Sequence, residues 1–205
     1  NLGPRLHLER TRAGEFIVDI NAFWREVDNQ IMPLGNERYE TYQNVYEARG
    51  RGLENVASWF SPRRYVFLHG QLTWEDFRNI SRRGNFSNTT GDRMPHRPYL
   101  FGSWIARLRF AGLPGPSDTV EPYYYGRYVH EFFRGWESLG LLDSKAVVPS
   151  QVQHTVGVTW TVHNQFARVS STLEVDNLTD AVLMDNYNVQ RPRRGVYVKL
   201  TAETL

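Results

Sequence analysis

The sequence predicts an all-β protein, a transmembrane antiparallel β-barrel wall, and three observations support this. Segments rich in β-branched and aromatic residues recur along the chain, and no 11-residue window shows a convincing helical period with caps. In the clearest segments, apolar side chains alternate with charged or hydroxylated ones. The links between segments are alternately short and long, as in outer-membrane barrels with turns on the periplasmic side and loops outside the cell.

The composition concentrates apolar area in aromatic rings. Hydrophobic residues make up only 40% of the chain, yet it holds 11 Tyr, 11 Phe and 6 Trp. A wall with one lipid-facing side accommodates such rings, whereas a soluble domain that exposed them would tend to aggregate. No run reaches the roughly 18 to 20 apolar residues of a membrane-spanning helix. On composition alone, the alternative is a secreted β-sandwich rich in Tyr and Trp.

Nine strands are expected along the chain. Their links are short at 13–14, 60–62, 112–119 and 164–165, and longer at 32–40, 79–96, 135–150 and 178–193. If the last strand runs towards the periplasm, every short link is periplasmic and every long one external. The expected strands are approximately 4–12, 15–31, 41–59, 63–78, 97–111, 120–134, 151–163, 166–177 and 194–203.

Alternation within these strands predicts one apolar and one polar face. The polar positions carry Gln, Thr, Ser, Glu and Arg, which is the pattern of a transmembrane barrel with a polar interior. The apolar face comprises Leu68, Leu72 and Trp74 in the fourth strand, Leu100, Trp104 and Leu108 in the fifth, Val152, Val156, Val158, Trp160 and Val162 in the seventh, and Val169, Leu173 and Val175 in the eighth.

Aromatic residues gather at the expected strand ends. Trp59, Phe60 and Tyr65 lie beside a short link. A second group beside a long link comprises Phe132, Phe133 and Trp136. Both groups are expected to form aromatic girdles at the two membrane interfaces.

The closing part of the chain carries a specific motif. Residues 171–181 read STLEVDNLTDA, 185–192 read DNYNVQRP and 196–200 read VYVKL. This order resembles the end of the TonB-dependent outer-membrane receptors, in which a penultimate strand ends in an NLTD turn, a loop carries a DNYxVQRPGR-like stretch and a final strand reads like xFYVKL. Looser similarity covers 21–31, 44–54 and 97–100. The motif residues are Asn177, Leu178, Thr179, Asp180, Asn186, Gln190, Arg191, Pro192 and Tyr197.

The motif residues have structural explanations. Asn177 and Asp180 can bond back to the local backbone and stop a strand. Pro192 cannot donate to a ladder and is expected in the loop before the last strand. Two features depart from the family pattern: Arg193 follows the proline where Gly is common, and the residues up to Leu205 lack a terminal aromatic.

The resemblance implies that residues 1–205 are the C-terminal nine or so strands of a larger barrel of about 22 strands. Nine is an odd number, whereas bacterial antiparallel barrels close with an even one. The plug, the TonB-contacting box and the earlier strands are therefore expected on a second chain or on a missing N-terminal part. The first four residues show no signal-peptide pattern, so such a peptide is either cleaved or was never part of this piece.

The resemblance also implies a function: an energised receptor in the bacterial outer membrane that imports a scarce nutrient such as a siderophore, metal chelate, glycan or peptide. Its partners would be outer-membrane lipid and, through the missing plug, the TonB complex, with a surface lipoprotein as a further candidate. A passive porin-like channel and a ligand-sensing or partner-anchoring barrel are the alternatives. A soluble sandwich would instead bury the face from Val152 to Val162 against a second sheet.

Other chemistry is not indicated. The absence of Cys excludes disulfides and thiol chemistry, and a net charge of +2 without a basic run does not favour nucleic acid. The six His residues have no metal-ligand spacing, and no phosphate loop or nucleophile elbow occurs, so no enzyme, metal or cofactor is expected.

Ligand recognition is expected in the long links, where Arg and aromatic side chains suit polar ligands. A solvated loop is the alternative explanation for each of these residues. The candidates are Arg82, Arg83, Arg93, His96, Arg134, Trp136 and Glu137.

Overall fold

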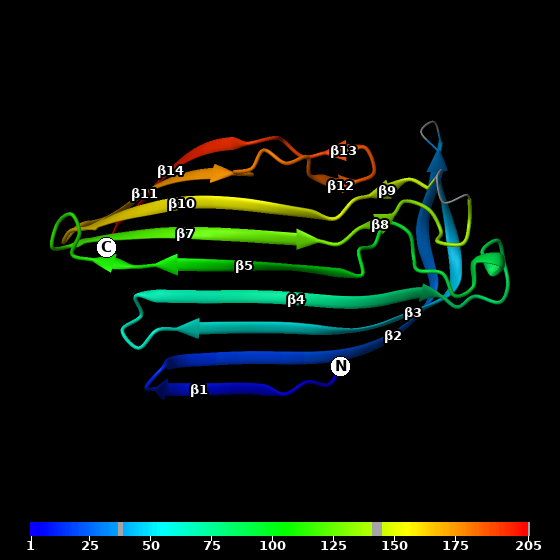
Figure 1. Cartoon of the computed structure of the whole chain (residues 1–205), viewed down its shortest axis with the longest axis horizontal. Coiled ribbons are helices and arrows are strands. Elements are labelled where there is room, and N and C mark those ends of the chain that lie inside the picture. Colours follow the sequence, from blue (N-terminus) through cyan, green and yellow to red (C-terminus); the bar gives the residue numbers. More distant parts are fainter. Residues whose placement is uncertain (37–38, 141–144, 205) are drawn as a thin grey trace.

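The computed structural model describes residues 1–36, 39–140 and 145–204. In this part of the chain, nine long strands form one antiparallel wall in the order β1-β2-β3-β4-β5-β7-β10-β11-β14 (Figure 1). They are β1 (Arg5–Thr11), β2 (Gly14–Asn36), β3 (Tyr39–Phe60), β4 (Val66–Asn79), β5 (Leu100–Leu108), β7 (Asp118–Val129), β10 (Gln151–His163), β11 (Ala167–Asp176) and β14 (Gly195–Thr204).

Smaller elements complete the fold. β6 (Phe110–Ala111) pairs with β7. Two small ribbons lie in the long links: β8 (Phe132–Phe133) with β9 (Val147–Val148), and β12 (Met184–Asn186) with β13 (Val189–Gln190). The link after β4 contains a short 3₁₀ helix, η1 (Ser87–Thr89). Among the described residues, no helix is long and apolar enough to cross a membrane.

The nine expected strands are all present, and the links separate as predicted. Short links join β1 to β2, β3 to β4 and β10 to β11 at one end of the wall, while the long links meet at the other end (Figure 1). We call the second end the long-link end. Each long strand runs antiparallel to the long strand before it in the sequence. Successive links therefore lie at alternate ends of the wall.

Three boundaries differ from the prediction. A long link is expected at 32–40, but β2 extends to Asn36, β3 begins at Tyr39, and the two strands keep their register to the pair Asn36↔Tyr39. The hairpin therefore projects beyond its neighbours (Figure 1). Pro33 and Gly35 are turn signals in the sequence, and the cross-strand ladder on both sides overrides them. The fifth strand ends at Leu108, and the sixth ends at Val129 rather than at 134.

The predicted faces of the wall are confirmed. Side chains on the apolar face are exposed, with Trp160 at 45% and Val158 at 36%, so within the described residues no second sheet covers them as a sandwich would require. The opposite face carries hydroxyl ladders. Thr159 lies 2.9 Å from Thr172 (Oγ1 to Oγ1), and Thr161 Oγ1 lies 2.9 Å from Ser170 Oγ.

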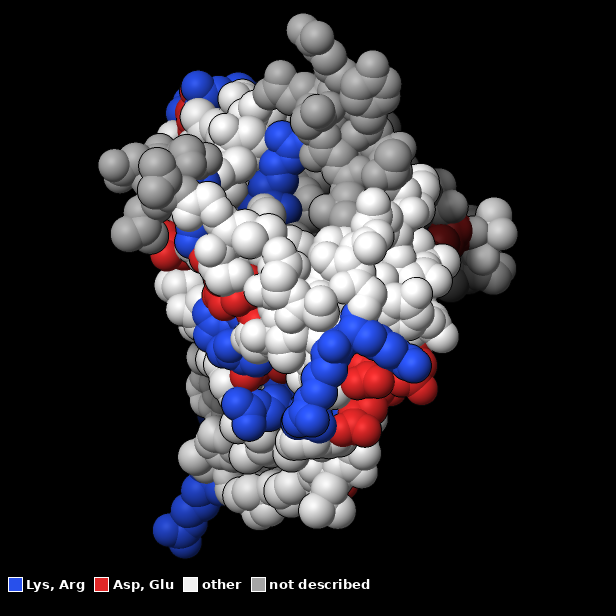
Figure 2. Space-filling view, turned by 90° about the vertical axis from the view of Figure 1, so that its right-hand side faces the viewer, with Lys and Arg blue, Asp and Glu red and all other residues white. Residues whose placement is uncertain are grey.

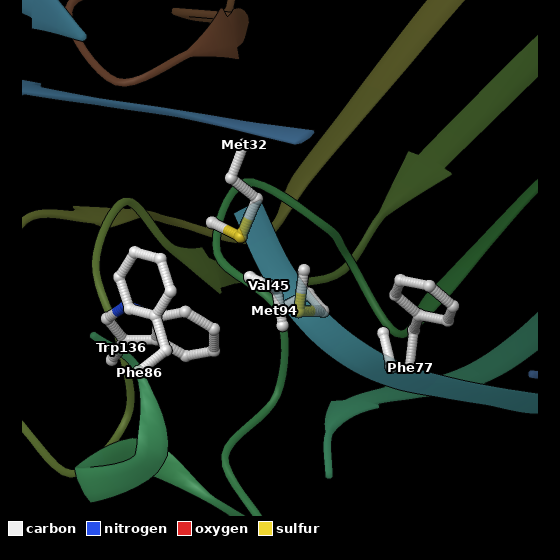
Figure 3. Packing of buried hydrophobic residues seen from close by; sticks show 7 residues of the cluster. Met32, Val45, Phe77, Phe86, Met94 and Trp136 are labelled. Carbon is white, nitrogen blue, oxygen red and sulfur yellow. The ribbon is translucent and has the colours of Figure 1, made fainter. Parts of the chain in front are cut away.

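Buried apolar residues gather at the long-link end. One cluster consists of Met32, Val45, Ala48, Phe77, Phe86, Met94 and Trp136 (Figure 3), and a second of Val129, Phe132 and Val148. The expected external girdle of Phe132, Phe133 and Trp136 is therefore wrong for Phe132 and Trp136, which are buried beneath the links. Local sequence could not reveal this, because the links that cover these rings are distant along the chain. Trp59 does lie beside a short link, where its Nε1 donates to Ala13 O at 2.8 Å.

The wall is open at both sides. In the described part of the chain, β1 pairs only with β2, and β14 pairs only with β11. Each outer strand therefore presents an unpaired row of backbone N–H and C=O groups, which in a membrane must be satisfied by further strands.

Candidate ligand-binding site

The link after β4 is anchored by the buried side chain of Asn79. Its Nδ2 donates to Phe86 O at 2.7 Å and to Thr89 Oγ1 at 3.0 Å, and its Oδ1 accepts from the Ser81 N–H at 2.9 Å. The backbone N–H of Asn79 also donates to Asp92 O at 3.0 Å. Residues 91–94 therefore run alongside the end of β4, which fixes the position of Arg93.

Arg93 joins two long links. Its Nη1 lies 3.5 Å from Glu137 Oε1, its backbone N–H donates to Glu137 Oε2 at 3.2 Å, and its guanidinium lies 4.2 Å from the ring centroid of Tyr99. Its Nε contacts Asp76 Oδ1 at 3.4 Å. Such a planar, delocalised cation suits both carboxylate and aromatic partners.

Asp76 holds this arrangement from β4. It lies two residues beyond Trp74, the last exposed aromatic side chain of the strand, and is only 4% exposed. Its carboxylate accepts hydrogen bonds from Arg78 Nε at 2.8 Å and from Arg51 Nη2 at 3.0 Å. Together with the contact to Arg93 Nε, these bonds gather three guanidiniums around one carboxylate, and Asp76 thereby orients Arg93.

A hollow of about 160 Å³ opens beside Arg93. Arg97 forms part of it, with its guanidinium 4.4 Å from the ring centroid of Phe77 and its Nη1 3.4 Å from Glu75 Oε1. Figure 2 shows this end of the molecule, where Lys and Arg side chains lie next to Asp and Glu. Ligand sites typically measure about 300–1,000 Å³, so the hollow suits one charged group of a larger ligand. It is lined by Arg93, Met94, Arg97, Tyr99, Glu131, Phe132, Phe133, Gly135 and Glu137.

Two of the seven predicted ligand-binding residues, Arg93 and Glu137, line this hollow. Trp136 is buried in the cluster of Figure 3, where it packs against Phe86 with ring centroids 5.3 Å apart. The hollow adds Tyr99 and Glu131, which the sequence does not single out because both fall inside expected strands, 97–111 and 120–134.

The other four predicted residues lie outside the hollow. Arg82 is exposed, and Arg83 lies over the ring of Tyr46 at 5.4 Å. His96 Nδ1 lies 2.7 Å from Asn186 Oδ1, which ties the link after β4 to the link after β11. Arg134 lies over the ring of Tyr187 at 5.6 Å.

The motif at the end of β11 behaves as the sequence predicts. Asn177 is fully buried in a left-handed conformation with φ 49°. Its Nδ2 donates to Ala181 O at 2.9 Å, and its Oδ1 accepts from the Ala181 N–H at 3.0 Å. Asp180 Oδ1 accepts from the Arg194 N–H at 3.0 Å. Leu178 N–H donates to His154 O at 2.7 Å, and Thr179 completes the exposed turn.

The remaining motif residues fix the last link. Arg191 binds Asp185 Oδ1 through Nη2 at 2.6 Å. Gln190 lies in β13, and Pro192 lies between β13 and β14 as expected. Tyr197 is opposite Glu174 in the pairing of β11 with β14.

No protein-family model matches the sequence, and no curated protein matches it. Solved structures do share its fold. The ferric preacinetobactin receptor BauA from Acinetobacter baumannii matches with a TM-score of 0.63 and 15% identity over 93% of this chain and 27% of that one. The FrpB iron transporter from Neisseria meningitidis matches with a TM-score of 0.65 and 14% identity over 93% of this chain and 29% of that one.

A third match is the ferric-catecholate import receptor Fiu from K12 E. coli, with a TM-score of 0.59 and 16% identity over 98% of this chain and 26% of that one. The fold of this chain is that of part of these receptor and transporter structures. The chain spans between 26% and 29% of the length of these proteins. The antiparallel wall, its exposed apolar face and its long-link end are thus accounted for by one known architecture.

Proposed function

We propose that this chain is the C-terminal barrel wall of an energised outer-membrane receptor, and that its long-link end contributes to the binding of an anionic metal chelate. The observation that carries the proposal is the arginine-lined hollow at the long-link end of a receptor-barrel wall. Arg93 and Arg97 supply positive charge, and Tyr99 and Phe133 supply aromatic surface.

The two faces of the wall support a location in the membrane. An exposed apolar face opposite a hydroxylated and charged face suits a wall between lipid and a polar interior. With the long links outside the cell, the hollow faces the medium from which a nutrient would arrive. The turn side then faces the periplasm.

The wall is proposed to be part of a larger barrel. Its two unpaired edges require further strands, and a closed bacterial barrel of this class has an even number, about 22. A second chain or an N-terminal part would supply these strands and a plug, and the TonB complex would act through the plug. A surface lipoprotein is a further candidate partner at the exposed long-link end.

The choice of an anionic chelate rests on charge and on the similar structures, whose names concern iron, ferric preacinetobactin and ferric catecholate. Glu137 neutralises Arg93 in this structure. An anionic group that entered the hollow would replace this carboxylate as the partner of the guanidinium. Because the hollow holds only part of such a ligand, the strands outside this chain would supply the rest of the site.

The test is chelate binding by the complete receptor. Arg93→Gln combined with Arg97→Gln should weaken binding of a ferric catecholate by about tenfold or more, since each charge-assisted hydrogen bond contributes about 1.5–3 kcal/mol. The matched control is Arg82→Gln, which removes an exposed arginine of the same link outside the hollow. Unchanged binding in the double variant would contradict the proposed site. A conductance independent of ligand and TonB would instead indicate a passive channel.

A further inference from the structure

A row of arginines lies on the apolar face of the wall, just beyond its aromatic residues. In the uninterrupted pairing of β3 with β4, Arg51 is opposite Asp76 and Arg49 is opposite Arg78. Because side chains two residues apart in a strand share a face, these four lie on the same face as the pair Leu53↔Trp74. The arginine row, defined as Arg49, Arg51 and Arg78, thus follows the exposed apolar belt towards the long-link end.

The row presents positive charge outwards. The side chains of Arg51, Arg49 and Arg78 are 55%, 42% and 37% exposed, whereas Asp76 beneath them is 4% exposed. Arg49 has Glu26 as an acidic neighbour at 3.1 Å, and Arg78 lies within electrostatic reach of Glu137 and Asp92. Arg93 and Glu137 neutralise each other at the side of Asp76. The guanidiniums therefore keep donors free for an outside anion, since each has five N–H groups.

An apolar groove of about 520 Å³ lies on the same face nearer the short links. Its floor is made by Ala57, Gly70 and Gly102, whose small side chains leave a depression across the strands. Its walls are larger residues, with Leu72 and Trp104 exposed to the outside. Asn55, at its edge, is four residues from Arg51 along β3, which corresponds to about 14 Å.

We propose that this face binds one phosphorylated lipid of the outer leaflet, with its phosphate on the arginine row and an acyl chain in the groove. The inference rests on the proposed membrane location. The groove runs across five strands, from Ile20 in β2 to Tyr128 in β7, and because barrel strands tilt by about 35–45°, a chain parallel to the membrane normal must cross them. Charge at one end and apolar surface at the other match the chemistry of a lipid and not that of a second β-sheet.

The test is native mass spectrometry of the complete receptor in detergent, with lipid A as the phosphorylated probe and fully dephosphorylated lipid A as the comparison. Arg49→Gln with Arg51→Gln should reduce retention of lipid A by about tenfold or more, since each arginine adds attraction to an anionic lipid. The matched control, Arg63→Gln with Arg64→Gln, removes two arginines from the short link between β3 and β4 and should retain it.

The groove is tested separately by Gly70→Leu. A Cβ on Gly70 meets its nearest atom at 3.8 Å, which is ordinary van der Waals contact, so a larger side chain can start from this position and extend into the groove. It should reduce retention of both lipids, whereas Ala106→Leu, on the same face outside the groove, should not. Equal retention of the two lipids by the native protein, or equal losses in variants and controls, would overturn the proposal. A dimer that Gly70→Leu dissociates would assign the groove to a second copy instead.

These readouts separate the two proposals. Gly70 lies far from the Arg93 hollow along the wall, so Gly70→Leu should leave chelate binding unchanged while it lowers lipid retention. Arg93→Gln with Arg97→Gln should weaken chelate binding and leave lipid retention unchanged. If only chelate binding fails as a property of the native protein, the lipid-site proposal is unaffected. If only lipid retention fails, the proposed receptor function is unaffected.

Discussion

The side chain of Gln151 is hydrogen-bonded twice to the backbone of Met184. Its Nε2 donates to Met184 O at 2.6 Å, and its Oε1 accepts from the Met184 N–H at 2.7 Å. Arg191 adds a backbone hydrogen bond to Leu183 O at 2.8 Å. The first residue of β10 thus fixes the long link after β11 against the polar face of the wall. The amide side chain of Gln151 thus satisfies the two backbone groups that a neighbouring strand would otherwise bond.

Gln151→Leu should release this link. Loss of two hydrogen bonds leaves two backbone groups of Met184 unsatisfied, at a cost of about 1–3 kcal/mol. Hydrogen exchange of the Met184 amide should accelerate by about tenfold or more. Thr159→Val, on the same face of β10, is the control and should leave that amide protected. Unchanged protection in Gln151→Leu would show that the remaining contacts hold the link alone.

Asn177 combines a left-handed backbone with two side-chain hydrogen bonds, and two substitutions separate these contributions. Asn177→Gly relieves the backbone but loses the hydrogen bonds, at about 1–2 kcal/mol, whereas Asn177→Ala adds a left-handed penalty of about 1 kcal/mol. The free energy of unfolding in urea should therefore fall in the order native, Gly, Ala. Equal free energies of unfolding for the Gly and Ala variants would show that the left-handed backbone conformation at residue 177 does not contribute to stability.

Trp136 is buried, and its Nε1 has no hydrogen-bond partner among the described residues. Trp136→Phe should therefore cost little beyond the smaller ring, and it removes an unsatisfied donor. Trp136→Ala should cost about 3–5 kcal/mol because it leaves a cavity beside Phe86. Thermal unfolding of the complete protein measures both. A loss for Trp136→Phe as large as that for Trp136→Ala would contradict the prediction and would indicate that the indole N–H has a hydrogen-bond partner.

Asp185 gives the link after β11 a pH dependence. The hydrogen bond from Arg191 lowers the pKa of Asp185 below its ordinary value of 3.8. A pKa that is lower in the folded than in the unfolded state stabilises the fold above 3.8, and the contribution is lost as the pH falls through the folded value. Because Asp185 is half exposed, the effect is small and weakened by salt.

The carboxyl ¹³C shift of Asp185 measures this titration. Its midpoint should lie below 3.8 in the native protein, and Arg191→Gln should return it towards that value. A midpoint at or above 3.8 in the native protein would contradict the ion pair.

Part of the candidate site followed from the sequence. Arg93 and Glu137 were singled out because charged residues of long links suit polar ligands, and both line the hollow. Trp136 was singled out for the same reason and is buried instead. Sequence cannot separate these cases, because the cover over Trp136 comes from Phe86, fifty residues earlier in the chain.

The sequence by itself determined the strands, the two faces of the wall and the alternation of short and long links. These depend on a period of two and on local turn chemistry, which are written in neighbouring residues. Only the tertiary structure decided how far β2 and β3 extend, which rings the long links bury and where Arg51, Arg78 and Arg93 meet Asp76. Those outcomes depend on pairing between distant segments, and the free energy of such contacts exists only once the wall has formed.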